Sequence, residues 1–121
     1  MPEDKRQHVR LPVENAVFIE LVAPEFGSNQ PAVIVRGTSV DVSRWGLRVT
    51  LAQELLVGAI LQVAVQLPAG AGTLVLVGEV IWSGPIPDTG TEPGWEAGFA
   101  LHNAEESDID SWVSLVAAIE G

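Results

Sequence analysis

Six short segments rich in β-branched and aromatic residues recur along this chain, and they constrain its fold more than any other feature of the sequence. Stretches that contain glycine or proline separate several of them, at residues 24–31, 68–72 and 84–94. A turn is expected at residues 41–45, because Asp and Ser hydrogen-bond the local backbone of turns. Short strands joined in this way are typical of a β-barrel or a β-sandwich. The predicted strands are residues 14–22, 32–40, 46–51, 60–67, 74–82 and 95–101.

The last segment of the chain has a helical period instead of an extended one. Its apolar positions fall on one face of a helix, at Ile109, Trp112, Val113, Val116 and Ile119. Asn103 and Glu106 have the spacing of a capping box, so the helix is expected to span residues 103–120. Such an apolar stripe must be covered, and the open mouth or edge of a small barrel offers the surface. The sequence therefore predicts a mainly β domain with one C-terminal amphipathic helix.

Length and composition favour a single globular domain. At 121 residues the chain is long enough for one hydrophobic core and short for two. Hydrophobic residues make up 47% and charged residues 18%, which is a globular balance. The absence of cysteine excludes disulfides, thiolate metal sites and a cysteine nucleophile. The first residues lack a signal-peptide pattern, and no apolar run is long enough to span a bilayer, so we expect a cytoplasmic protein without membrane insertion.

The charge is distributed unevenly along the chain. The formal net charge is -10, and all six basic residues lie within the first 48 positions together with six acidic ones. The remaining ten acidic residues follow without any Lys or Arg. Binding to long nucleic acids depends on neutralising many phosphates, so this balance argues against it. A small anion, by contrast, would be bound by the front portion of the chain.

Two short motifs stand out once the strands are placed. RQHVR at residues 6–10 precedes the first strand, and DVSRWG at residues 41–46 lies in the first internal turn. They resemble the two signatures of the PilZ family, RxxxR and D/N-x-S-x-x-G, in the same order. GEVIW at residues 78–82 resembles the G-x-V-x-W strand of that family, and Gly98-Phe99 resembles its late glycine-aromatic element. The resemblance extends over nearly the whole chain.

The resemblance implies a six-stranded antiparallel β-barrel with a C-terminal helix, and it implies that the ligand is the bacterial second messenger cyclic di-GMP. Arg6 and Arg10 would then donate in pairs to guanine O6 and N7 or to phosphate oxygens. Asp41 would accept from the N1 and N2 donors of guanine. Ser43 would bind nearby polar groups, and Gly46 would provide a backbone conformation or a close approach barred to other residues.

Three further residues are candidates for ligand contact. Trp82 could stack on a guanine, although core packing would suit a tryptophan equally well. Arg44 lies within the second motif and could add a phosphate contact. Lys5 precedes the first motif, at a position that the family associates with the number of ligands bound. Arg36 and Arg48 lie on predicted strands and are expected to be solvated.

Catalysis is not expected, because the sequence lacks the groupings that it would need. Neither a phosphate-cradling GxxxxGK(S/T) motif nor a GxSxG motif occurs. His8 and His102 are isolated histidines and make a poor metal site without cysteine or a spaced carboxylate cluster. Four acidic residues suit either a helix N-terminus or a partner's surface, and they are Glu105, Glu106, Asp108 and Asp110. We therefore expect neither a metal nor a cofactor.

By resemblance, the chain is a receptor that binds cyclic di-GMP and relays the signal to an unidentified protein partner. The first motif lies on a leader, residues 1–13, that is expected to be flexible, ahead of a barrel at residues 14–102. Binding would order this leader and change the surface offered to the partner. The alternative is a PilZ-like protein interaction module that does not bind the nucleotide. An oligonucleotide-binding barrel would need basic and aromatic residues together across its strands, and the acidic second half does not supply this combination because it has no Lys or Arg.

Overall fold

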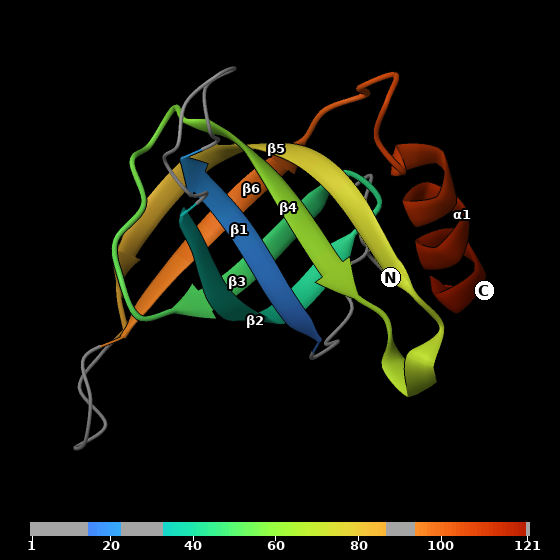
Figure 1. Cartoon of the computed structure of the whole chain (residues 1–121), viewed down its shortest axis with the longest axis horizontal. Coiled ribbons are helices and arrows are strands. Elements are labelled where there is room, and N and C mark those ends of the chain that lie inside the picture. Colours follow the sequence, from blue (N-terminus) through green and yellow to red (C-terminus); the bar gives the residue numbers. More distant parts are fainter. Residues whose placement is uncertain (1–14, 23–32, 87–93, 121) are drawn as a thin grey trace, which may run out of the picture.

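The computed structural model describes residues 15–22, 33–86 and 94–120, and in these residues six strands form a closed barrel (Figure 1). Successive side chains of a strand point to opposite faces, so a two-residue apolar period builds a one-sided core. In β3 (Gly46–Leu51), for example, Leu47, Val49 and Leu51 are buried and Arg48 lies between them on the outer face. The six predicted strands and the C-terminal helix are confirmed.

Every strand pairs antiparallel with two neighbours, in the closed order β1-β2-β3-β6-β5-β4. The pairing of β1 with β4 completes the barrel and removes the edges that an open sheet would expose. The β-barrel implied by the family resemblance is therefore confirmed, and the alternative of a β-sandwich is wrong. The remaining elements are β1 (Ala16–Val22), β2 (Val33–Ser43), β4 (Ile60–Gln66), the short 3-10 helix η1 (Pro68–Gly70), β5 (Thr73–Pro85), β6 (Trp95–Leu101) and the helix α1 (Ile109–Glu120).

The hairpin between β2 and β3 is tighter than the sequence predicts. The predicted turn covers residues 41–45, but Asp41 to Ser43 belong to β2, and the turn itself contains only Arg44 and Trp45. Ser43 pairs with Gly46 across the hairpin. Val42 is buried in the core, and burial of this side chain extends the strand by stabilising its extended backbone.

Two glycines make room for aromatic side chains of the neighbouring strand. Gly98 on β6 lies opposite Trp82 on β5, and a Cβ atom at Gly98 would lie 2.2 Å from Trp82 Nε1. Gly78 on β5 lies against Phe99 on β6, and a Cβ atom there would lie 3.1 Å from Phe99 Cδ2. Phe99 is buried inside the barrel, whereas Trp82 lies outside it. The contact between β5 and β6 is therefore fixed by one aromatic-glycine pair on each face.

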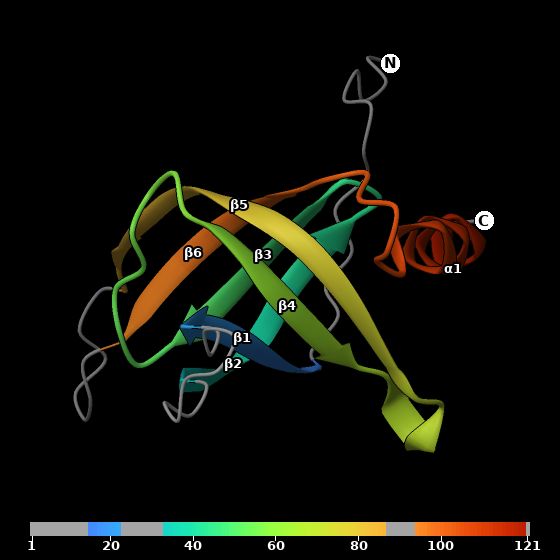
Figure 2. The ribbon, with the colours of Figure 1, turned by 45° about the horizontal axis from the view of Figure 1, so that its top comes forward.

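Helix α1 lies at one end of the barrel, beside β5, and begins later than predicted (Figures 1 and 2). The Asp108 N–H donates to the Val75 carbonyl oxygen at 2.8 Å, and the Val75 N–H donates to Asp108 Oδ2 at 2.8 Å. These two bonds hold residue 108 against β5, so the helix starts at Ile109. The capping box at Asn103 and Glu106 is therefore wrong, since both residues precede the helix.

The apolar stripe of α1 covers the barrel over most of its length. Ile109, Trp112 and Val116 are buried, Val113 is half-buried, and Ile119 near the end is exposed. The indole of Trp112 also donates a buried hydrogen bond from Nε1 to the Ser43 carbonyl oxygen at 3.0 Å. Within the described residues, the helices are too short to cross a bilayer.

Truncation of a core leucine tests the assignment of the barrel interior. Leu76 is fully buried, so Leu76→Ala should lower the free energy of unfolding by about 2–5 kcal/mol, through lost burial and an unfilled cavity. Leu56 is 77% exposed and supplies the matched control, since Leu56→Ala should change stability by less than about 0.5 kcal/mol. Urea denaturation measures both values. Equal costs for the two variants would contradict the placement of the core.

The aromatic-glycine contact outside the barrel has its own matched pair of variants. Gly98→Ala should displace the Trp82 indole and cost about 1–3 kcal/mol of stability, because the new methyl group would overlap the ring. Gly84 on β5 has no atom within 4 Å of the equivalent position, so Gly84→Ala should be close to neutral. Denaturation gives the stability, and the indole N–H signals in an NMR spectrum report the displacement. An unshifted Trp82 signal in Gly98→Ala would refute the contact.

Candidate functional site

A row of four residues crosses the outer face of the barrel and joins two of the predicted site residues. Cross-strand pairing places Asp41 of β2 opposite Arg48 of β3, Arg48 opposite Gly98 of β6, and Gly98 opposite Trp82 of β5. Paired residues of neighbouring strands point to the same face of a sheet. We call these four residues the Asp41–Trp82 row. It brings Asp41 and Trp82 onto one surface, although they lie far apart in the sequence.

Two β-bulges give the ends of this row their outward direction. The pairing register shifts between Ser39 and Asp41 in β2, and between Val80 and Trp82 in β5. Ser39 and Val80 are fully buried, so strict alternation would turn Asp41 and Trp82 inward as well. One extra residue at each bulge reverses the direction of the next side chains along the strand. Both candidate residues therefore reach the outer face through an interruption of the strand pattern.

The Asp41 carboxylate is held in place by Arg48. Arg48 Nη2 lies 2.7 Å from Asp41 Oδ2, with the Asp41 side chain 13% exposed and the Arg48 side chain 32% exposed. Glu96 on β6 lies further away, with 3.9 Å between its Oε2 and Arg48 Nη1. Arg48 Nε is buried and lacks a hydrogen-bond partner within the described part of the chain. The prediction that Arg48 is solvated is therefore wrong, because its guanidinium is used to orient Asp41.

Arg48 is the residue that sequence reasoning missed. The alternation within β3 indicates an outward Arg48, but its pairing with Asp41 depends on the register between two strands and on the bulge in β2. A carboxylate has two oxygens with about four lone-pair sites. It can therefore accept from Arg48 and from a further donor at the same time.

Trp82 is an exposed aromatic surface. Its indole lies over Gly98 and is 38% exposed, so core packing is excluded for this residue. Neighbouring strands are about 4.8 Å apart, so the three strand spacings from Asp41 to Trp82 extend over about 14 Å. The row thus combines a hydrogen-bond acceptor at one end with a flat apolar face at the other.

Ser43 and Gly46 close the hairpin next to the row. Ser43 is buried, and its Oγ would lie 2.9 Å from a Cβ atom at Gly46, so glycine is needed for close approach. Gly46 does not have a positive φ angle, unlike Gly58, Gly70 and Gly72. The role of Gly46 is therefore not to provide an unusual backbone conformation. Arg44 and Trp45 are exposed in the turn. Through the Ser43 carbonyl, this hairpin is bonded to Trp112 of α1.

The predicted first motif lies outside the described residues, and with it Lys5, Arg6 and Arg10. Asn15 is the first residue that the structure describes, and it is hydrogen-bonded to β2. The Asn15 N–H donates to Ser39 Oγ at 2.8 Å, and the Asn15 carbonyl oxygen accepts from the Ser39 N–H at 2.9 Å. Ser39 is two positions before Asp41, so Asn15, which comes soon after the first motif in the sequence, is anchored beside the Asp41 end of the row.

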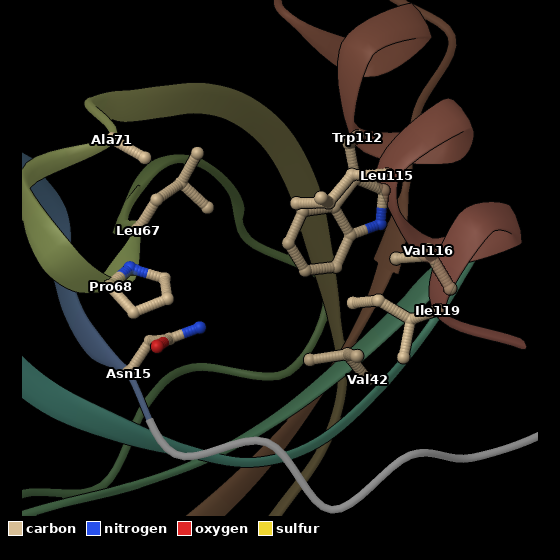
Figure 3. Close-up of a pocket in the computed structure, with 9 residues that line it drawn as sticks. All are labelled: Asn15, Val42, Leu67, Pro68, Ala71, Trp112, Leu115, Val116 and Ile119. Atoms are coloured by element: carbon tan, nitrogen blue, oxygen red, sulfur yellow. The ribbon is translucent and has the colours of Figure 1, made fainter.

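An apolar pocket of about 180 Å³ lies between α1 and the barrel (Figure 3). Its lining comes from four parts of the chain. These are Asn15 before β1, Val42 of β2, Leu67, Pro68 and Ala71 in and around η1, and Trp112, Leu115, Val116 and Ile119 of α1. Of the predicted ligand-binding residues that the structure describes, none is among them. Burying phosphates and base edges against such a lining would leave their polar groups without partners. The pocket therefore does not suit a nucleotide.

The titratable residues of the described segments form no group of three that could hold a metal ion. His102 lies on the surface, where its Nε2 is 3.5 Å from Glu79 Oε1. Arg36 is exposed, as predicted for a solvated side chain.

Comparisons with known proteins agree with this architecture. A family model described as PilZ domain matches residues 4–118. The search of curated proteins found no match. Among solved structures, the inhibitor of motility MotI (DgrA) of Bacillus subtilis is similar with a TM-score of 0.67 at 17% identity, over 98% of this chain and 52% of that chain.

Two further solved structures have the same fold. The PilZ domain of YcgR from Escherichia coli, solved with cyclic di-GMP, matches with a TM-score of 0.65 at 14% identity, over 97% of this chain and 92% of that one. MrkH, described as a cyclic di-GMP-dependent transcription regulatory factor, matches with a TM-score of 0.68 at 12% identity, over 96% of this chain and 51% of that one. This chain thus spans about half the length of MotI and of MrkH. Because the family model covers nearly the whole sequence, the chain belongs to the PilZ domain family.

Proposed function

We propose that this chain is a cytoplasmic, non-catalytic receptor for cyclic di-GMP that relays the signal to a protein partner. The observation that carries the proposal is the Asp41–Trp82 row, in which a carboxylate oriented by Arg48 and an exposed indole share one face. The ligand combines guanine edges, which need hydrogen-bond partners, with flat faces, which stack on aromatic rings. The row offers both.

Asp41 is the proposed acceptor for a guanine. Guanine N1 and N2 are donors, and an ionised carboxylate binds two such donors more strongly than a neutral group does. Trp82 would stack on a base at the other end of the row, since its strand is three strand spacings from that of Asp41. Ser43 and Gly46 shape the hairpin beside Asp41, and Arg44 in the exposed turn is a candidate for a phosphate contact.

Arg6 and Arg10 are the proposed donors to guanine or phosphate, and Lys5 is a further candidate. Covalent geometry permits this role. Five residues of chain span at most about 18 Å, and they connect Arg10 to Asn15, which is bonded to Ser39 on the strand that carries Asp41. The similarity in fold to the YcgR domain solved with cyclic di-GMP supports the choice of ligand.

In this proposal the signal is a change of order in the leader, residues 1–13. A ligand that binds Arg6 and Arg10 together with Asp41 joins the leader to the barrel, and the surface seen by a partner then includes both. The rival function is a PilZ-like interaction module that acts without the nucleotide. Direct titration separates the two.

Calorimetric titration of cyclic di-GMP into the purified chain is the first test, with GTP as the ligand control. Arg10→Ala and Asp41→Asn should each weaken binding by about tenfold or more, since a charge-assisted hydrogen bond contributes about 1.5–3 kcal/mol. Asparagine replaces Asp41 because this carboxylate is mostly buried against Arg48, and alanine would remove the oxygen that lies 2.7 Å from Arg48 Nη2. Exposed Arg36 supplies the control variant, Arg36→Ala, which should bind normally.

The absence of heat in the wild-type titration would favour the interaction module. Full affinity in Asp41→Asn would remove Asp41 from the site.

Limited trypsin digestion tests the ordering of the leader. Lys5, Arg6 and Arg10 are cleavage sites within it, whereas Arg36 and Arg48 lie on strands. Saturating cyclic di-GMP should slow cleavage in the leader severalfold, as followed by mass spectrometry. Arg10→Lys is a matched control because it keeps the cleavage site and loses the forked guanidinium, so the ligand should protect it less. Identical wild-type cleavage rates with and without saturating ligand would contradict the mechanism.

A further inference from the structure

Four large apolar side chains are exposed together on one side of the barrel. They come from the loop before β4, the first residue of β4 and the bulge of β5, and they are Leu56, Val57, Ile60 and Ile81. Each is between 51% and 77% exposed. We call them the Ile81 patch. A contiguous apolar patch on a folded domain marks an interaction site more often than scattered exposed side chains do.

Backbone hydrogen bonds attach the end of the loop before β4 to β5. The Gly58 N–H donates to the Val80 carbonyl oxygen at 2.7 Å, and the Val80 N–H donates to the Ala59 carbonyl oxygen at 2.9 Å. These bonds extend the β4–β5 ladder past Ile60, which itself pairs with Glu79. The end of the loop is therefore attached beside Ile81, and its apolar side chains flank that residue.

The loop is also anchored to the barrel at Leu55, next to its exposed apolar side chains. Leu55 is buried in the core, and its N–H donates to Ser83 Oγ at 3.2 Å. Leu56 and Val57 come directly after it and point away from the core. Figures 1 and 2 show this loop at the opposite end of the barrel from α1. Helix α1 therefore leaves the patch uncovered.

The charge around the patch selects the partner. Glu54 is exposed beside Leu55, and Glu79 lies next to Ile60 across the ladder. The chain has no Lys or Arg after Arg48, and its net charge is -10. An acidic rim attracts Lys and Arg side chains of a protein. It repels anionic lipid, and it repels a second copy of this acidic chain.

The patch also adjoins the Asp41–Trp82 row, because Ile81 immediately precedes Trp82 in the bulge of β5. We infer that the Ile81 patch is the docking surface for a partner segment with an apolar face flanked by Lys or Arg, such as a basic amphipathic helix. A nucleotide stacked on Trp82 would border this surface, so its binding would change the affinity of the patch for the partner segment. The link to the nucleotide rests on the proposed function, whereas the docking surface does not.

The test uses the full chain and a defined probe, a synthetic amphipathic helix of Leu and Lys, with a Leu and Glu peptide of the same pattern as its acidic twin. Amide NMR shifts locate binding, and their titration measures affinity. The basic peptide should shift residues 54–60 and 79–82 saturably, and the acidic twin should not. Val57→Lys should weaken binding by about tenfold or more, as expected for a central interface position. Ile119→Lys is the control, since Ile119 is similarly exposed but lies on α1.

A charge-reversal pair tests the acidic rim separately. Glu54→Lys should weaken binding of the basic peptide, while Glu105→Lys, an equal change in net charge near α1, should not. The inference is overturned if the shifts map to α1, if Val57→Lys binds like the wild type, or if the acidic twin binds equally well. It is also overturned if anionic phosphatidylserine vesicles or self-association, instead of the peptide, perturb the patch.

Titration of cyclic di-GMP into Val57→Lys separates this inference from the proposed function. Normal nucleotide affinity with lost peptide binding would support a docking surface distinct from the ligand site. If the wild-type chain binds the peptide specifically but does not bind the nucleotide, the docking surface is supported and the proposed receptor function is refuted. Equal peptide affinity with and without saturating nucleotide, in a chain that binds both, would refute the coupling between them.

Discussion

The closed barrel imposes the two-residue alternation on which the rest of the structure depends. Because every strand has two bonded neighbours, each side chain points either into the core or onto the outer face. Valine and leucine fill the interior, and a buried polar ligand site there would displace the core. The chemistry of this domain is therefore displayed on the outside, as Arg48 is between Leu47 and Val49.

The places where this alternation is interrupted are the places where the candidate site is built. The bulges in β2 and β5 turn Asp41 and Trp82 outward, and the register of β3 and β6 sets Arg48 and Gly98 between them. The β5 bulge also exposes Ile81, so one irregularity supplies both the end of the row and one residue of the apolar patch. The proposed ligand surface and the proposed docking surface thus share a structural cause.

A second connection leads from the same hairpin to α1. The Ser43 carbonyl accepts the buried indole N–H of Trp112, and Ser43 is two residues from Asp41. Asp108 fixes the start of the helix to Val75 on β5. The helix is therefore bonded to the barrel both at the residue before it and in its first turn, which favours a fixed position for α1.

The sequence by itself determined the elements of this protein: six strands from apolar alternation and turn residues, and one helix from a change of period. Each of these depends on neighbours in sequence. Only the tertiary structure decided that Arg48 pairs with Asp41, that Trp82 lies outside the barrel, and that α1 starts at Ile109. The physical reason is that these features depend on strand register, on bulges and on hydrogen bonds between segments far apart in the sequence. Local sequence propensity carries no information about such contacts.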